Sequence, residues 1–413
     1  MIRLASGGGI LVAALGLFAT AVSAQQPSAP AAPPPGSALI GRPEDNAAAA
    51  KLAPIPAPPL ATAADKLPID RLKVPDGFKV ELYASGLPNA RSLALGDKGT
   101  VFVGSRVVDK VYAIVNKDGK REVKVVVSGL YRPNGVAFKN GTLYIAELSQ
   151  ISKIDNVEDT LDNAPKPTVI YSDLPKDEAH GWKFLAVGPD NMLYFNIGAP
   201  CNICMPSPAH AQLRRIKLDG SGAEVIAQGI RQVVGMDFHP ASKVLYFTEN
   251  QRDWLSEDQP NDKLNRLLNP GKDNFGFPYC DGGDIEDSTF GWGHSCSEFT
   301  KPILQLGPHV APLGMRFYTG RTFPARYRDA IFLARHGSWN KTHKIGGDIY
   351  VVNLNKDGTV KSHEPFMTGF LQNNEYIGRP VDVLVMPDGS LLISDDRNGA
   401  VYRVSYGEKS AGR

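Results

Sequence analysis

The sequence predicts an all-β fold, a six-bladed β-propeller closed by pairing of an N-terminal strand with a C-terminal one. Two observations predict it. A short apolar strand, a turn and a second strand rich in aromatic and β-branched residues recur six times. The last copy is followed by one further strand candidate, whereas most copies are followed by two. A strand candidate that could complete the last blade lies ahead of all the copies, over residues 78–87.

The repeated unit has the length and the turn chemistry of a propeller blade. Successive copies start roughly 43 to 79 residues apart, which suits four strands plus insertions. Their turns contain Gly, Asn and Asp, which adopt a positive φ at little cost in tight hairpins. A pair of β-sandwiches, the alternative fold, explains neither the six copies nor the leftover strand at each end. The copies start at Ser92, Gly135, Phe184, Gly235, Gly314 and Asp382.

The region before the repeats indicates export. Arg3 precedes an apolar run over residues 10–19, and small residues lead to Ala24, as in a secretory signal peptide that is cleaved after that residue. We therefore expect a periplasmic or secreted protein. The expected parts are a signal peptide over 1–24, a Pro/Ala-rich disordered linker over 25–66, the propeller over 67–406 and a flexible tail over 407–413.

Composition argues against some classes of partner and limits the ways in which the cysteines can pair. The 45 basic and 43 acidic side chains give a net charge of +2, which argues against a nucleic-acid surface. No stretch after the signal peptide approaches the ~20 apolar residues of a spanning helix. Four cysteines allow three pairings, and an exported chain permits disulfides. We expect local pairing, Cys201 with Cys204 and Cys280 with Cys296.

The residues just before the inner strands converge on the axial mouth of a propeller, because these strands all start at one face of the ring. Here they are rich in cations, and loops after the second strands open toward the same face. Arg binds planar carboxylates through two parallel hydrogen bonds, so the mouth suits a small polyanion that carries carboxylates. The candidates before the strands are Asn89, Arg91, Asn134, His180, Lys183, Arg231, Gln232, His309 and Arg379. The loops add Arg106, Glu147, Asn250, Gln251, Arg335, His336, Asp395 and Asp396.

Several stretches support a more specific interpretation: HGWKF, GAPCNIC, GIRQVVGMDFHP, YFTENQRDWL, FGFPYCDGGDI, APLGMRFYTG, HGSWN and GRPVDVLVMPDGSLLISDD. Together they resemble the quinoprotein glucose/sorbosone dehydrogenase family over nearly the whole folded region. The resemblance implies an aldose or L-sorbosone dehydrogenase with pyrroloquinoline quinone (PQQ) and calcium at the mouth of the propeller. It would oxidise an aldose or a sugar aldehyde at C1 and pass electrons to an unidentified acceptor, a periplasmic cytochrome or a quinone.

The resemblance also implies roles for individual residues. His180 is the expected general base, which accepts the C1 hydroxyl proton as hydride leaves for the quinone. Apart from the resemblance, closeness in sequence makes Asp177 or Glu178 a candidate to orient or tune it. Arg231 is the expected catalytic cation beside the quinone oxygens. The cofactor contacts implied are Asn134, Lys183, Arg231, Gln232 (where the family usually has Asn), His336 and Arg379. Main-chain oxygens of Gln251 and Arg252 are the expected calcium ligands, with Asp262 as an acidic neighbour.

Two other functions compete with the dehydrogenase. A metal-dependent lactonase on a similar propeller would place carboxylate and Asn ligands before the inner strands, where this chain has Asn, His, Lys and Arg. A non-catalytic binding propeller tethered at the cell envelope would reduce no electron acceptor, even with the cofactor supplied.

Overall fold

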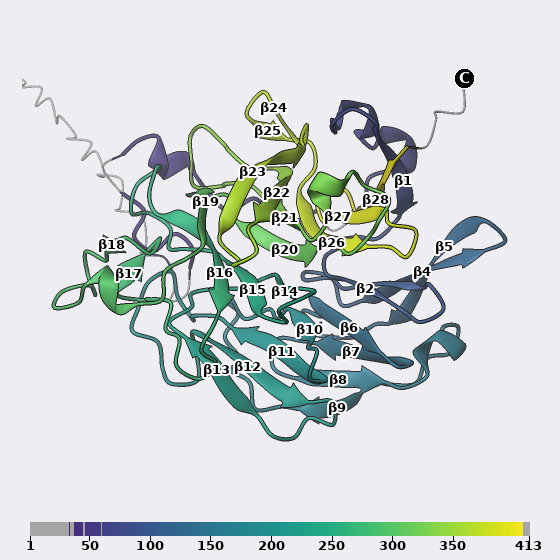
Figure 1. The fold of residues 1–413 in the computed structure, drawn as a ribbon, viewed down its shortest axis with the longest axis horizontal. Coiled ribbons are helices and arrows are strands. Elements are labelled where there is room, and N and C mark those ends of the chain that lie inside the picture. Colours follow the sequence, from purple (N-terminus) through teal and green to yellow (C-terminus); the bar gives the residue numbers. More distant parts are fainter. Residues whose placement is uncertain (1–32, 34–36, 44–45, 59, 408–413) are drawn as a thin grey trace, which may run out of the picture. The chain divides into compact units, whose positions relative to one another are not determined.

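The predicted six-bladed β-propeller is confirmed by the computed structural model (Figure 1). Six four-stranded antiparallel sheets follow one another along the chain. The expected signal peptide, parts of the expected linker and the stretch 408–413 of the expected tail lie outside the described residues. The structure describes residues 33, 37–43, 46–58 and 60–407.

The first three blades are uninterrupted four-stranded units. Blade 1 contains β2 (Leu93–Leu95), β3 (Val101–Val103), β4 (Val111–Lys117) and β5 (Lys120–Val127). Blade 2 contains β6 (Gly135–Lys139), β7 (Thr142–Ala146), β8 (Ile151–Ile154) and β9 (Thr168–Tyr171). Blade 3 contains β10 (Leu185–Val187), β11 (Met192–Ile197), β12 (Gln212–Lys217) and β13 (Glu224–Gln228).

The other three blades include one with an insertion and one that joins the two ends of the fold. Blade 4 contains β14 (Met236–Phe238), β15 (Leu245–Glu249), β16 (Asn261–Leu267) and β19 (Leu304–Pro308). Blade 5 contains β20 (Pro312–Phe317), β21 (Ile331–Arg335), β22 (Asp348–Leu354) and β23 (Val360–Met367). Blade 6 contains β26 (Pro380–Val385), β27 (Leu391–Asp395), β28 (Ala400–Tyr406) and β1 (Phe78–Ser85).

Shorter elements connect the blades. Hairpin β17–β18 (Cys280–Asp281 and Ile285–Glu286) is inserted between β16 and β19, and hairpin β24–β25 (Leu371–Gln372 and Glu375–Tyr376) lies between blades 5 and 6. The described 3-10 helices are η1 (Ala49–Lys51), η2 (Ala64–Lys66), η3 (Ile69–Arg71), η4 (Val157–Asp159), η5 (Cys296–Glu298) and η6 (Ala325–Tyr327). None of the helices in the described part of the chain is long and apolar enough to cross a membrane.

Closure of the ring follows the prediction. Strand β1 pairs antiparallel with β28, from Phe78 opposite Tyr406 to Ser85 opposite Ala400. The inner strand of every blade contacts the inner strands of its two neighbours, in the order β2, β6, β10, β14, β20, β26 and back to β2. The sheets therefore form a closed ring, and the loops before the inner strands meet at one mouth.

Apolar side chains fill the spaces between neighbouring blades. Leu93 and Val101 of blade 1, for example, pack against Leu392 and Val401 of blade 6 in one buried cluster. Equivalent clusters occupy the other inter-blade spaces. Burying an aliphatic or aromatic side chain of this size contributes about 1.5–3 kcal/mol. The blades are thus fixed relative to one another, which makes the mouth a rigid frame.

Both expected disulfides are confirmed. Cys201 pairs with Cys204, and Cys280 pairs with Cys296. The first bridge lies in the loop after β11, which contributes Asn202 to the mouth of the ring. The second joins hairpin β17–β18 to η5. Both bridges therefore stabilise loops outside the blades.

Much of the expected linker is packed onto the propeller. Trp254 donates its indole N–H to the carbonyl oxygen of Ala38 at 2.7 Å, and Asn202 donates to that of Ile40 at 3.2 Å. Thr62 bonds Asn398 through both its amide and its hydroxyl group. The composition offers little apolar surface, but backbone carbonyls need no apolar side chain to accept these bonds. In the described residues, this region is therefore attached to the ring.

Candidate active site

A cavity of about 230 Å³ lies at the mouth of the ring. Trp182 packs in an apolar cluster with Val234, Leu313 and Val381, and all of these except Val381 line the cavity. Such a surface suits the face of a planar ring. The cavity brings together many of the residues predicted from sequence: Arg91, Arg106, His180, Arg231, Gln232, Asn250, Gln251, His309, His336 and Arg379, with Asp262 beside them.

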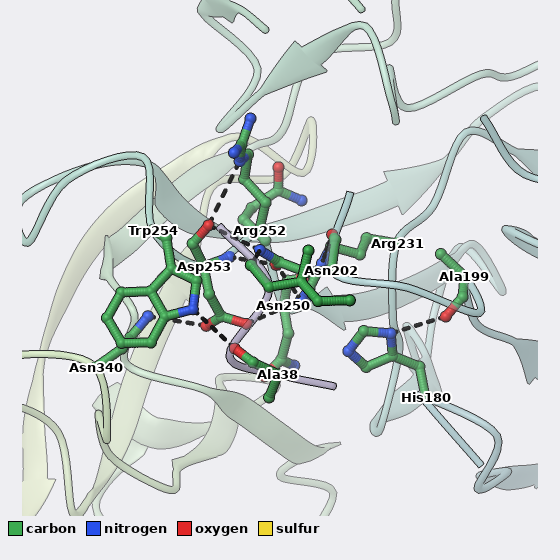
Figure 2. A network of polar contacts seen from close by, with 12 residues as sticks. Ala38, His180, Ala199, Asn202, Arg231, Asn250, Arg252, Asp253, Trp254 and Asn340 are labelled. Carbon is green, nitrogen blue, oxygen red and sulfur yellow. Dashed lines mark hydrogen bonds and ion pairs between the residues drawn. The ribbon is translucent and has the colours of Figure 1, made fainter. Parts of the chain in front are cut away.

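His180 is held as a neutral base. Its Nδ1 lies 2.8 Å from the carbonyl oxygen of Ala199, and since a carbonyl only accepts, Nδ1 carries the proton (Figure 2). Nε2 is then unprotonated, and it has no hydrogen-bond partner among the described residues. Burial, and next the positive charge of Arg231, lower the pKa of His180 to about 3. The residue also has a left-handed φ of 50°, a strained conformation that is common at functional sites.

Gly198 permits the close contact between His180 and its acceptor loop. A Cβ at this position would lie 2.6 Å from the His180 Cβ and 2.2 Å from the side-chain amide of Gln232. Any side chain would push the loop away. The glycine of the GAPCNIC stretch is therefore part of the geometry that orients the base.

The expectation that Asp177 or Glu178 orients His180 is wrong. Asp177 pairs with His210 at 3.0 Å, and Glu178 pairs with Arg132 at 2.8 Å. Closeness in sequence does not bring either carboxylate to the ring, because the left-handed turn at His180 directs the imidazole toward the next loop. A backbone carbonyl orients the base instead.

Gln232 connects His180 to the apolar side of the cavity. With Nε2 of its amide directed at the His180 carbonyl oxygen (3.0 Å), its Oε1 accepts the indole N–H of Trp182 at 3.3 Å. The amide thus uses both ends within the protein. Gln232 lines the cavity, as predicted, and also fixes the positions of two other residues that line it.

Arg231 is fixed by groups from other loops. Its Nε donates to the Asn202 carbonyl oxygen at 2.8 Å, and Nη2 donates to Asn202 Oδ1 at 2.9 Å and to Asp253 Oδ2 at 3.1 Å (Figure 2). Asn340 donates to the other oxygen of Asp253 at 2.8 Å. Burial lowers the pKa of Arg231, and the negative charge of Asp253 partly offsets this decrease. The guanidinium is therefore held rigidly, 3% exposed, beside His180.

Asn202, Asp253 and Asn340 were missed as site residues by the sequence reasoning. They lie in the stretches CNIC, RDW and SWN, which supported the family resemblance. None of these stretches directly precedes an inner strand, so their position did not mark them as part of the mouth. Trp182 was missed too, although it stands two residues after His180. An aromatic residue in a segment that precedes an inner strand is the available signal for it.

A second buried network lies across the cavity. Asp396 accepts from Arg91 Nη1 at 2.7 Å and lies 2.9 Å from His336 Nε2. Burial alone would raise the pKa of Asp396, but His336 and Arg91 hold it well below its usual range. This carboxylate is ionised and neutralises part of the positive charge of the site. His336 lines the cavity, whereas Arg335 pairs with Asp348 outside it.

Two arginines of the cavity have no carboxylate partner among the described residues. Arg379 donates to the carbonyl oxygens of His336 (3.1 Å) and Gly337 (2.7 Å). Arg106 lies over the Trp182 ring at 4.5 Å, and its Nε has no hydrogen-bond partner in the described part of the protein. Burial, and next the charge of Arg91, lower the pKa of Arg106 to about 9. Asp396 offsets part of the charge of both arginines without an ion pair, and an anionic ligand would offset the remainder.

Of the residues with a predicted cofactor or calcium role, Asn134, Lys183 and Arg252 do not line the cavity. The other candidates that do not line it are Asn89, Glu147, Arg335, Asp395 and Asp396. Asn134 accepts from Arg91 Nε at 2.6 Å and donates to the Lys183 carbonyl oxygen at 2.8 Å. Lys183 donates to the carbonyl oxygens of Leu148 (3.0 Å) and Gly181, and burial lowers its pKa to about 7. Arg252 forms an ion pair with Asp287. Asn134 and Lys183 bond neighbouring residues at the ends of the blades, whereas Arg252 is held by the insertion that follows hairpin β17–β18.

The segment predicted to bind calcium presents main-chain oxygen. The backbone N–H of Gln251 donates to Asp262 Oδ1 at 2.7 Å, and the side-chain amide of Gln251 is hydrogen-bonded to Glu249 and Gly282. The carbonyl oxygens of Gln251 and Arg252 accept no hydrogen bond from the described residues. Among all the described residues, no three His, Cys, Asp or Glu side chains form a metal cluster. The residues present therefore fit a cation that takes main-chain oxygen ligands, which is usual for calcium.

Residues 72–407 match a protein family described as TrAA12-like. The chain belongs to the TrAA12-like family. An uncharacterized protein of Borreliella burgdorferi is 33% identical over 351 residues, with 81% of this chain and 91% of that protein covered. A pyrroloquinoline quinone-dependent pyranose dehydrogenase of Coprinopsis cinerea is 22% identical over 405 residues and covers 80% of this chain. The match spans only 54% of the Coprinopsis enzyme.

Solved structures similar to this TrAA12-like chain include the holo PQQ domain of the Coprinopsis pyranose dehydrogenase, with a TM-score of 0.70, 21% identity and coverage of 81% of this chain and 97% of that one. A calcium structure of the family AA12 enzyme of Trichoderma reesei gives a TM-score of 0.71 at 18% identity, covering 83% and 98%. At these identities the likeness establishes the fold. The predicted relation to quinoprotein sugar dehydrogenases is confirmed at the level of the family.

Proposed function

We propose that this protein is a PQQ- and calcium-dependent dehydrogenase that oxidises an aldose or a sorbosone-like sugar aldehyde at C1. One observation carries the proposal. The unprotonated Nε2 of His180 shares a cavity with Arg106 and Arg379, two arginines that have no carboxylate partner in the described part of the chain. A base next to cations that Asp396 offsets only in part suits a reaction in which a proton leaves the substrate while negative charge develops on a bound acceptor.

The cofactor contacts proposed are the cations and polar groups of the cavity wall. Arg106 and Arg379 would bind carboxylates of PQQ, and Arg231 and His336 would lie near its other oxygens. The apolar surface at Trp182 suits the face of its ring system. The main-chain oxygens of Gln251 and Arg252 would hold calcium. The names of the Coprinopsis and Trichoderma relatives, which mention PQQ and calcium, support this assignment.

The residues of the chain would divide the reaction between them. PQQ, when bound, supplies the two-electron acceptor for the hydride that leaves C1. His180 Nε2 would accept the proton of the C1 hydroxyl of a cyclic aldose, or of the hydrate of a sugar aldehyde, so that a carbonyl forms at C1 and the proton stays on the imidazole. Arg231, held by Asn202 and Asp253, would stabilise negative charge on the acceptor side. The cavity wall would orient the sugar and exclude water.

We also propose that the protein acts outside the cytoplasm and delivers its electrons to a separate acceptor, a periplasmic cytochrome or a quinone. The two disulfides support an oxidising compartment. The expected signal peptide over 1–24 lies outside the described residues, so this part of the proposal rests on the sequence.

The decisive experiment is reconstitution. The purified apoprotein is given PQQ, calcium or both, and reduction of an artificial electron acceptor is followed with a panel of aldoses and sorbosone. We expect reduction only when both additions are present, and its loss when a chelator removes calcium. Lactone hydrolysis without PQQ would favour the lactonase alternative. Absence of both activities, together with absence of PQQ binding, would contradict the proposal.

The pH dependence of kcat/KM offers a separate test. The active form needs a neutral His180, and its pKa is about 3 rather than the ordinary 6.5 because of burial and Arg231. A bound tricarboxylate offsets part of the effect of Arg231, so we expect the acid limb of the profile between about 3 and 6.5. Initial rates of acceptor reduction measured over the acid range check this. A half-maximal rate at or above pH 6.5 on the acid side would contradict it.

A further inference from the structure

The chain that precedes the propeller closes one side of the cavity. We call residues 37–43 and 46–58 the N-terminal cap. Ala38, Pro54 and Ile55 of the cap line the cavity together with His180 and the arginines. Residues 55–58 also lie over Arg106, His336 and Arg379 on a smaller adjoining cavity. The cap belongs to the same compact unit as the blades.

The cap is latched to the rim through its backbone. The indole N–H of Trp254 donates to the Ala38 carbonyl oxygen at 2.7 Å (Figure 2), and Asn202 Nδ2 donates to that of Ile40 at 3.2 Å. Within the cap, Arg42 Nη1 donates to the carbonyl oxygens of Ala50 (3.1 Å) and Leu52 (3.3 Å). These few hydrogen bonds and the partial burial of apolar cap residues such as Ile40 and Ile55 are weaker support than the buried clusters of the blades.

The cap encloses the arginines without satisfying them. The cap side chains that line the main cavity are apolar, and among the described residues none donates to or accepts from Arg106 or Arg379. With the cap in place, the cavity measures about 230 Å³. A long substrate that enters this cavity would have to pass the cap residues Ala38, Pro54 and Ile55 that line it.

We infer that the N-terminal cap sets the size of the substrate, restricting the enzyme to single sugar units, and that the latch at Trp254 controls how often longer chains enter. This inference rests on the proposed function. Ile55 is its specificity-determining residue, since it faces both cavities over the cations. A monosaccharide reacts beneath the closed cap, whereas an oligosaccharide needs the cap displaced.

The test combines proteolysis with substrate size. Trp254→Phe keeps the aromatic packing but removes the donor to Ala38, so we expect trypsin to cut the Lys51–Leu52 bond about 2- to 10-fold faster. We expect a similar rise in kcat/KM for maltotriose relative to glucose. Ile55→Ala widens the cavity without touching the latch and should raise only this ratio. Trp292→Phe, the same change at a side chain that is 93% exposed, should alter neither quantity.

The outcomes separate the inference from the proposed function. Unchanged maltotriose-to-glucose ratios in both Trp254→Phe and Ile55→Ala would overturn the cap as a size limit. Unchanged cleavage at Lys51 in Trp254→Phe would overturn the latch. Proteolysis is read on the apoprotein and needs no turnover. If no sugar reduces the acceptor, but Trp254→Phe accelerates cleavage, the proposed function fails while the latch stands.

Discussion

Replacing His180 by alanine is expected to lower kcat about 10²- to 10⁴-fold while PQQ affinity changes by only a few-fold. The imidazole contributes through one atom, Nε2, because Nδ1 is committed to the Ala199 carbonyl oxygen. The arginines that would hold the cofactor do not depend on this ring. Steady-state acceptor reduction gives kcat, and an equilibrium titration with PQQ gives the affinity.

His309→Ala is the matched control for this substitution. His309 also lines the cavity and has a left-handed φ, 56° against 50° for His180. Both of its ring nitrogens are engaged, Nε2 with the Ser256 carbonyl oxygen at 2.7 Å and Nδ1 with Asn340 at 3.2 Å. It therefore has no free lone pair, and we expect less than about a tenfold loss of kcat. Equal losses in the two variants, or undiminished turnover in His180→Ala, would remove His180 from the base role.

The sequence predicted the fold because the propeller repeats a local pattern. Each copy carries its own apolar strand, its turn and its second strand, and the leftover strand at Phe78 needed only the partner that ends at Tyr406. None of these features depends on contacts between blades. The position of a segment directly before an inner strand also predicted correctly that it lies at the mouth. His180, Arg231 and Arg379 line the cavity for this reason.

The position of a residue before an inner strand could not predict the direction of its side chain. Lys183 and Arg231 both precede inner strands, yet Lys183 turns toward backbone carbonyls of blade 2 while Arg231 faces the cavity. The partners of Arg231 come from loops in other parts of the chain, Asn202 and Asp253. Such pairings depend on how loops fold over the mouth, and no sequence spacing encodes them.

Composition was misleading for the cap. A Pro- and Ala-rich stretch buries too little apolar surface to fold alone, which favoured a disordered linker. Its attachment uses backbone carbonyls of Ala38 and Ile40 and donors supplied by Trp254 and Asn202. Acceptors of this kind exist at every residue, so their use is decided by the donors that the ring presents.

Arg106→Met is expected to move cofactor affinity and apoprotein stability in opposite directions. Arg106 is half-buried and has no carboxylate partner within ion-pair distance among the described residues, and its pKa is lowered to about 9 by desolvation and by Arg91. Methionine can keep the contact with the Trp182 ring while removing the charge. We expect the apoprotein to gain about 0.5–2 kcal/mol in free energy of unfolding. Loss of a charged hydrogen bond to a carboxylate should weaken PQQ binding about 10- to 100-fold.

Arg121→Met provides the control, because Arg121 lies over the Tyr83 ring at 4.3 Å, much as Arg106 lies over Trp182, but does not line the cavity. Urea denaturation of the apoproteins and titration with PQQ would be run on both variants. Arg121→Met should leave PQQ affinity unchanged and should not stabilise the fold, since the exposed guanidinium carries no burial cost to relieve. If Arg106→Met destabilises the apoprotein, the charge of Arg106 must be compensated within the chain. If PQQ affinity also stays unchanged, Arg106 does not bind the anion, and the remaining cations, above all Arg379, must hold it.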